Sequence, residues 1–226
     1  MKPDPVIIAL DFDNARDADH LVGTLGDSAK IYKVGMELFA AAGMDYVRSL
    51  TGRGKSVFLD MKYHDIGETV KRAVAVAARS GASFLTVHGL GQVMRAAVEG
   101  RGDSPLKLIA ITVLTSLDQD DLREQGYSGT IPDLVAQRVE QAMKIGMDGI
   151  VASPLEARAI RAQAGPGAII ITPGVRSRGA AAGDQKRVAT PREAVDDGVD
   201  YVVIGRQVSR APDPAAALAA IRAELA

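Results

Sequence analysis

Short apolar runs recur along the chain and alternate with longer segments in which apolar residues return at helical spacing. The runs are rich in β-branched residues and show little polar alternation, which is typical of parallel strands covered on both faces. The segments between them, among them 66–80, 134–145 and 191–197, are long enough for helices that connect parallel strands. Eight strands are predicted, at 6–10, 31–34, 56–59, 84–87, 107–112, 149–152, 168–172 and 201–204.

Eight successive strand and helix units favour a (β/α)8 TIM barrel over an open doubly wound sheet. Such barrels usually run to about 250 residues, so a chain of 226 residues would form a compact one. No change in composition and no low-complexity tract marks a boundary, and we expect a single domain over 1–226. The longest interval between predicted strands holds 116–133, where we expect an added loop or helix.

The overall composition excludes several classes of function. With 27 basic and 28 acidic residues the formal net charge is −1, so no broad basic surface is available for nucleic acid or an anionic membrane. The apolar run near the N-terminus is too short for a signal peptide, and no segment reaches the length of a membrane span. The absence of cysteine excludes disulfides and thiolate chemistry. We expect a cytoplasmic protein that acts on a small molecule.

Charged residues follow the apolar runs at the ends of the first three predicted strands, where the active site of such a barrel is expected. Asp11 follows the first strand, Lys33 lies in the second, and Asp60, Lys62 and Asp65 follow the third. Because strand side chains alternate between faces, Asp60 and Lys62 share one face. Each charge taken singly fits an ordinary rim salt bridge. Together they indicate a functional cluster, because exposed ion pairs stabilise little and buried pairs often destabilise.

The segment 60–70, Asp-Met-Lys-Tyr-His-Asp-Ile-Gly-Glu-Thr-Val, resembles the motif of the orotidine 5'-phosphate decarboxylases. The resemblance extends over nearly the whole chain, because further segments match the family in order, at 9–11, 33–35, 114–116, 172–176, 183–185 and 204–206. The motif at 60–70, taken by itself, also occurs in sugar-phosphate decarboxylases and synthases of the same superfamily. The other matching segments are specific to the orotidine 5'-phosphate decarboxylases.

The resemblance implies conversion of orotidine 5'-phosphate to UMP, the last step of pyrimidine nucleotide synthesis de novo, without metal or cofactor. Loss of CO2 leaves electrons on C6 that the ring delocalises poorly, and enzymes lower such barriers electrostatically, by on the order of 20 kcal/mol in demanding cases. Lys62 is the expected proton donor, held charged by Asp60 and Asp65. Asp60 would lie near the departing carboxylate, and Lys33 would orient Asp60 and contact the ribose.

The same resemblance assigns further contacts to the substrate. Asp11 is expected to bind the ribose hydroxyls and Thr115 the pyrimidine. Asp65 and Thr69 are expected to reach across the interface of a homodimer into the partner's site. The phosphate is expected after strands seven and eight, as is usual in these barrels, with Arg176 and Gln185 on a loop that closes and with Gly205 and Arg206 at the end of the last strand.

Metal chemistry is the main alternative in this part of the chain. His64 and His88 could join Asp11 or Asp60 as ligands, but ammonium groups at 33 and 62 would occupy the space of the cation, so we expect no metal site. Two other functions stay open. One is a metal-dependent sugar-phosphate decarboxylase or aldolase of the same superfamily, and the other is a non-catalytic binder of nucleotide phosphates. No dinucleotide, P-loop or serine-hydrolase motif is present.

Overall fold

Eight parallel strands close into a barrel in which each strand pairs with the next and β8 pairs with β1. The structure, a computed structural model, describes residues 4–177 and 189–225. The predicted (β/α)8 barrel is confirmed. The strands are β1 (Val6–Ala9), β2 (Ile31–Gly35), β3 (Ser56–Tyr63), β4 (Phe84–His88), β5 (Lys107–Ile111), β6 (Gly149–Val151), β7 (Ile169–Thr172) and β8 (Tyr201–Ile204).

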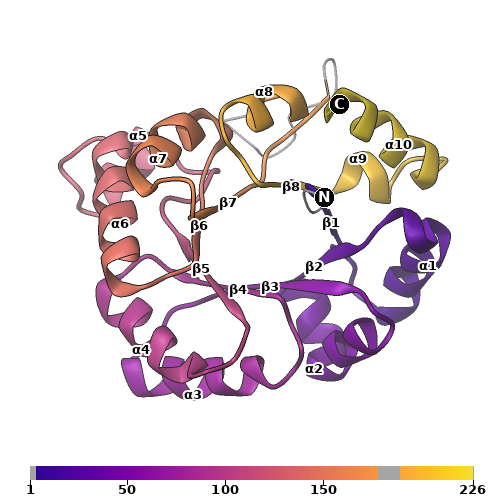
Figure 1. Ribbon diagram of the computed structural model, residues 1–226, viewed down its shortest axis with the longest axis horizontal. Helices are drawn as coiled ribbons and strands as arrows, with labels where there is room; N and C mark the ends of the chain where they lie inside the picture. Colours follow the sequence, from indigo (N-terminus) through magenta and orange to yellow (C-terminus); the bar gives the residue numbers. More distant parts are fainter. Residues whose placement is uncertain (1–3, 178–188, 226) are drawn as a thin grey trace.

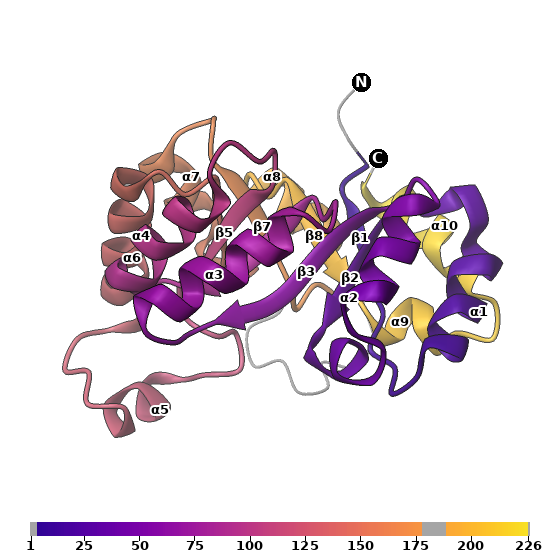
Figure 2. The same ribbon diagram turned by 90° about the horizontal axis from the view of Figure 1, so that it is seen from below.

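Helices surround the strands as an outer ring (Figure 1). Figure 2 shows α5 standing away from this ring, inside the interval where an added loop or helix was predicted. No described helix is both long and apolar enough to cross a bilayer. The helices are α1 (Ala15–Leu25), η1 (Gly26–Ser28), α2 (Met36–Gly52), α3 (Gly67–Ala78), α4 (Gly91–Arg101), α5 (Gln119–Glu124), α6 (Ile131–Ile145), η2 (Pro154–Glu156), α7 (Ala157–Ala164), α8 (Pro191–Asp196), α9 (Arg206–Ser209) and α10 (Pro214–Leu225).

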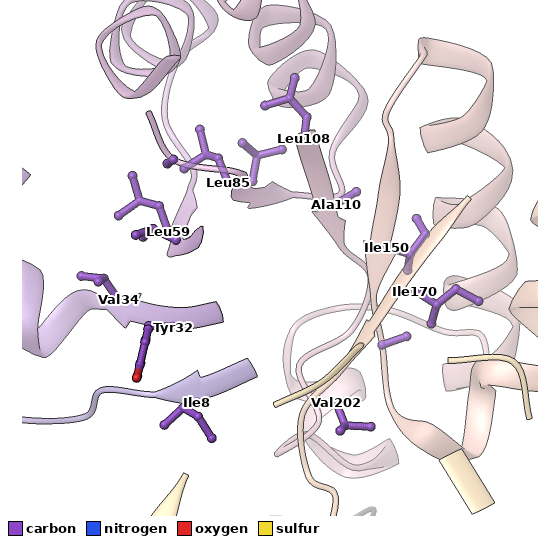
Figure 3. Packing of buried hydrophobic residues seen from close by; sticks show 14 of the residues in the cluster. Ile8, Tyr32, Val34, Leu59, Leu85, Leu108, Ala110, Ile150, Ile170 and Val202 are labelled. Carbon is purple, nitrogen blue, oxygen red and sulfur yellow. The ribbon is translucent and has the colours of Figure 1, made fainter. Parts of the chain in front are cut away.

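The strands are apolar on both faces because each face meets a different core. One set of side chains packs between the strands and the helices, with Ile8, Val34 and Leu85 among those drawn in Figure 3. The other set fills the barrel interior, where Phe58 and Phe84 meet edge to face with ring centroids 6.1 Å apart. The interior is therefore a packed core with no room for a ligand. A ligand site is expected at the end of the barrel, beyond this core.

The end of the barrel where the strands begin is tied by carboxylates that cap neighbouring strands. Asp148 accepts a hydrogen bond from the backbone N–H of Leu108 at 2.9 Å and forms ion pairs with Arg101 and Lys107. Asp200 caps β7 in the same way, because its carboxylate accepts a hydrogen bond from the backbone N–H of Ile170. These contacts stabilise the face opposite the strand ends and leave those ends free for chemistry.

Strand β3 runs to Tyr63, four residues beyond its predicted end. Its pairing with β4 is regular at Leu59 and Leu85 and resumes at Tyr63 and Val87. Three residues of β3 therefore face a single residue of β4, and this bulge bends the strand at the barrel mouth. Lys62 lies in the bulge and is the one described non-glycine residue with a positive φ, at 50°.

Candidate active site

A cavity of about 420 Å³ lies at the ends of the strands. Its floor is the upper part of the interior core, with Ala9, Phe58, Ile111, Val151 and Val203 facing it. Charged and polar groups form its walls, so a ligand would meet an apolar surface below and fixed charges at the sides. Eight of the predicted site residues line it, namely Asp11, Lys33, Asp60, Lys62, Thr115, Arg176, Gly205 and Arg206.

Four of these side chains form a line of alternating charge along the neighbouring strands β1, β2 and β3. The Nζ atom of Lys62 lies 2.8 Å from Oδ2 of Asp60. The Nζ atom of Lys33 lies 4.0 Å from the same oxygen and 2.8 Å from Oδ1 of Asp11. The side chains of Lys33 and Asp60 are only 13% and 14% exposed, so each charge depends on its neighbours for compensation.

The strand register explains how Lys33 and Asp60 meet. Lys33 is opposite Phe58 and Gly35 is opposite Asp60 in the pairing of β2 with β3. Alternation then directs Lys33 and Asp60 to the same interior face. A Cβ at residue 35 would lie 2.9 Å from the Nζ atom of Lys33, so a side chain there would displace the ammonium. Glycine at this position leaves room for the charge.

The side chain of Lys62 lines the cavity, but the alternation of side chains along a regular strand does not explain its position. The prediction put Asp60 and Lys62 on one face of a regular strand, whereas Lys62 sits in the bulge with a left-handed backbone. Its backbone N–H donates to Oγ1 of Thr86 at 2.8 Å, and the Thr86 hydroxyl donates to Oδ1 of Asp60 at 3.0 Å. The sequence reading missed Thr86. A signal was present, because a threonine stands at an inward position between the apolar residues of this strand.

Asp65 and Thr69 lie outside the cavity of their own chain. Both are exposed, and the carboxylate of Asp65 accepts the backbone N–H of Ile66 at 2.6 Å. Within residues 4–177 and 189–225 Asp65 forms no ion pair, so the expected alternation of charge ends at Lys62 in a single chain. Ile66, between the two, is 68% exposed.

The opposite wall of the cavity comes from the ends of β7 and β8. Arg176 and Arg206 bring two guanidinium groups to it. A Cβ at Gly205 would make only ordinary contacts with the protein, the nearest at 3.7 Å to Oδ2 of Asp11. Neighbouring atoms therefore leave room for a side chain there, and without one this space opens on the cavity, where a ligand can approach the backbone. Gln185 lies outside the described residues.

A smaller hollow behind the site contains the two histidines considered as metal ligands. The rings of His64 and His88 lie 4.9 Å apart between centroids. Burial lowers the pKa of His88, and electrostatic interaction with the nearby His64, Arg138 and Lys62 lowers it further. Among the described residues no three or more His, Cys, Asp or Glu side chains are grouped as metal ligands.

Comparison with known proteins gives one consistent result. The profile of the Orotidine 5'-phosphate decarboxylase / HUMPS family matches residues 4–221. A protein of Rhodopseudomonas palustris (strain ATCC BAA-98 / CGA009) named orotidine 5'-phosphate decarboxylase is 52% identical over 223 residues, covering 99% of this chain and 94% of that protein. Its namesake in Methylorubrum extorquens (strain PA1) is 51% identical over 222 residues, covering 98% and 95%.

Solved structures agree with this result. The crystal structure of orotidine 5'-phosphate decarboxylase from Lactobacillus acidophilus superposes with a TM-score of 0.86 at 37% sequence identity and covers 98% of each chain. The crystal structure of an uncharacterized conserved protein from Geobacillus kaustophilus gives a TM-score of 0.85 at 35% identity, covering 98% of this chain. Both sequence and fold are therefore similar along nearly the full length.

Proposed function

The chain belongs to the orotidine 5'-phosphate decarboxylase / HUMPS family and decarboxylates orotidine 5'-phosphate to UMP, and we propose that Lys62 is the proton donor in this reaction. One observation carries the proposal for Lys62. Its ammonium lies 2.8 Å from a mostly buried carboxylate, that of Asp60, on the wall of a cavity with an apolar floor. A fixed positive charge beside a poorly solvated space is what a developing carbanion requires.

The chemistry of the step follows from where the electrons go. The bond between C6 and the carboxylate carbon breaks, CO2 leaves, and the electron pair stays on C6 in the plane of the ring. The ammonium of Lys62 lowers the energy of this carbanion by its charge and then transfers a proton to C6. The neutral amine regains a proton from water. The balance is one proton consumed and one CO2 released, and no electron acceptor is needed.

Asp60 and Lys33 set the charge around the reacting carbon. Asp60 lies on the same wall as Lys62, and we place the departing carboxylate of the substrate next to it. Lys33, at 4.0 Å from Oδ2 of Asp60, compensates the negative charge that accumulates there before CO2 leaves. We assign the rate enhancement mainly to stabilisation of the transition state by Lys62, because only interactions that strengthen in the transition state raise kcat.

The rest of the cavity is assigned to binding. The pyrimidine lies beside Lys62 and the phosphate lies at the wall formed by β7 and β8. The ribose spans the distance between them. Remote phosphate contacts can contribute binding energy to the chemical step. The proposed contacts are Asp11 and Lys33 to the ribose, Thr115 to the pyrimidine, and Arg176, Gln185, Gly205 and Arg206 to the phosphate.

We also propose that the protein acts as a homodimer in which Asp65 and Thr69 enter the partner's site. Two observations support this. Both residues are exposed and lie outside the cavity of their own chain. The neighbouring Ile66 presents an apolar side chain to solvent, as the centre of an interface requires. Asp65 would then provide the second carboxylate beside Lys62 that a single chain does not supply.

The function is tested with the purified protein after treatment with a chelator. The fall in absorbance of orotidine 5'-phosphate is followed at several substrate concentrations, and a ketose phosphate with and without Mg2+ serves as the competing substrate. We expect turnover of orotidine 5'-phosphate alone, unchanged by the chelator. Turnover of the ketose phosphate that requires Mg2+, with none of the nucleotide, would instead assign the chain to the metal-dependent branch of its superfamily.

A further inference from the structure

We propose that Thr86 is a positioning residue for the catalytic pair, and that its one hydroxyl sets both the carboxylate of Asp60 and the backbone of Lys62. The inference rests on the roles proposed above for Asp60 and Lys62. Thr86 lies on β4, is fully buried, and does not line the cavity. Any effect that it has on the reaction must therefore pass through the two residues that it contacts.

The strand register places Thr86 alone against the bulge. Between the paired positions Leu59–Leu85 and Tyr63–Val87, β3 has three residues and β4 has only Thr86. A regular parallel ladder cannot continue across such a mismatch, because the extra residues lack backbone partners. The Thr86 side chain supplies one, since its Oγ1 accepts the backbone N–H of Lys62 at 2.8 Å.

This contact acts on a backbone conformation that lysine rarely adopts. Lys62 has a φ of 50°, where the Cβ of an L-residue is crowded, so the surroundings must hold it there. Without the acceptor on Thr86, the N–H of Lys62 would lose its partner in a partly buried strand, and the bulge could relax toward ordinary extended geometry. The direction of the Lys62 side chain would change with it.

The hydroxyl also fixes the rotation of the Asp60 carboxylate. A threonine hydroxyl has a single hydrogen; because Oγ1 accepts from Lys62, its own hydrogen is directed to Oδ1 of Asp60, at 3.0 Å. The other oxygen, Oδ2, is then the one turned toward Lys62, at 2.8 Å, and toward Lys33, at 4.0 Å. Each carboxylate oxygen thus has its own partner, and the ion pair has one defined geometry.

Packing alone does not account for a threonine at this position. The neighbouring inward residue of the same strand is Phe84, in the apolar core of the barrel. Valine has nearly the volume of threonine and carries no hydroxyl to desolvate, so it would serve packing at least as well. What valine lacks is the pair of hydrogen bonds that join the two catalytic residues.

The test compares Thr86→Val, which removes the hydroxyl at nearly constant volume, with Thr86→Ser, which retains it. We expect Thr86→Val to lower kcat by about tenfold to 100-fold with KM changed less than about threefold. Thr86→Ser should stay within about threefold of the wild-type kcat. The control is Ser80→Ala, which removes a buried hydroxyl that donates to the backbone oxygen of Ala77. Neither Ser80 nor Ala77 lines the cavity, so kcat should not change.

A second readout needs no substrate. Hydrogen exchange of the Lys62 amide, followed by NMR in the free protein, should be faster in Thr86→Val than in the wild type and unchanged in Thr86→Ser. If Thr86→Val is too unstable to purify, Thr86→Ala is measured in its place. Because this readout is independent of turnover, it separates failure of the positioning role from failure of the proposed function.

The positioning role is overturned by any of three results. The first is a wild-type kcat in Thr86→Val. The second is a Thr86→Ser variant as slow as Thr86→Val, which would mean that shape and not the hydroxyl matters. The third is unchanged protection of the Lys62 amide when the hydroxyl is removed.

Discussion

Lys33 and Asp11 form an ion pair 2.8 Å long that joins β2 to β1 at the mouth of the barrel. The same ammonium lies 4.0 Å from Asp60, so Lys33 connects the residue assigned to the ribose with the residues assigned to catalysis. Of the two carboxylates, that of Asp11 is the more open, with its side chain 52% exposed. A substrate hydroxyl can therefore reach Asp11 without breaking the pair between Asp60 and Lys62.

Replacement of Lys33 should impair both binding and catalysis. Lys33→Ala leaves Asp11 and Asp60 without their shared cation, and we expect kcat to fall by about 100-fold or more and KM to rise. Steady-state kinetics with orotidine 5'-phosphate measure both. A Lys33→Ala enzyme with wild-type kcat would remove Lys33 from the charge network that we describe.

Replacement of Arg206 should weaken binding of the phosphate. For Arg206→Ala we expect KM for orotidine 5'-phosphate to rise by about tenfold to 100-fold, with a much smaller effect on orotidine, which lacks the phosphate. Arg210→Ala is the matched control, because Arg210 is exposed, follows Arg206 by one turn and is not among the cavity residues. Equal losses with both substrates would show that Arg206 acts on something other than the phosphate.

Mixing inactive variants tests whether Asp65 works in the partner's site. A heterodimer of Lys62→Ala and Asp65→Ala chains would contain one complete site and one site that lacks both groups. Random exchange of subunits should then restore activity to about a quarter of the wild-type level. The control pair is Lys62→Ala with Asp60→Ala, whose residues lie 2.8 Å apart in one chain, so no complete site can form. If Asp65→Ala is inactive alone and its mixture with Lys62→Ala stays inactive, Asp65 acts in the site of its own chain.

Much of the fold could be predicted from the sequence because the signals are local. The strand β8 (Tyr201–Ile204) has the predicted bounds, since a run of four apolar residues is ended by Gly205. The meeting of Lys33 with Asp60 also follows from local rules, because alternation and the order of parallel strands put both on one interior face.

The features that the sequence did not predict depend on the pairing of two strands and, for Asp65, on the second chain that we propose. The end of β3 was placed at 59 and not at Tyr63 because the bulge is a property of the register between β3 and β4, which neither strand encodes alone. Thr86 was missed for the same reason, because its hydrogen bonds to Asp60 and Lys62 depend on the bulge of β3 that lies opposite it. Asp65 matches the family motif, but the site that it serves cannot be deduced from the geometry of one chain.

The opposite face of the barrel should affect stability and not catalysis. Asp148→Ala removes the acceptor of the Leu108 N–H and the partner of Arg101, both mostly buried. We expect the free energy of unfolding to fall by about 2 kcal/mol, measured by urea denaturation, with kcat unchanged. Asp197→Ala, whose partner Arg158 is 82% exposed, should cost less than about 1 kcal/mol. A large loss of kcat in folded Asp148→Ala would contradict this separation of stability from chemistry.

The most direct test of the account is the single-turnover rate of Lys62→Ala with orotidine 5'-phosphate, set beside its affinity for UMP. We predict that removal of the ammonium lowers the rate by at least about 10⁴-fold, because both the stabilising charge and the proton donor are lost. The affinity for UMP should change less than about tenfold. The exposed Lys30→Ala serves as control and should keep the wild-type rate. A Lys62→Ala rate within tenfold of the wild type would contradict the assignment of Lys62 as the proton donor.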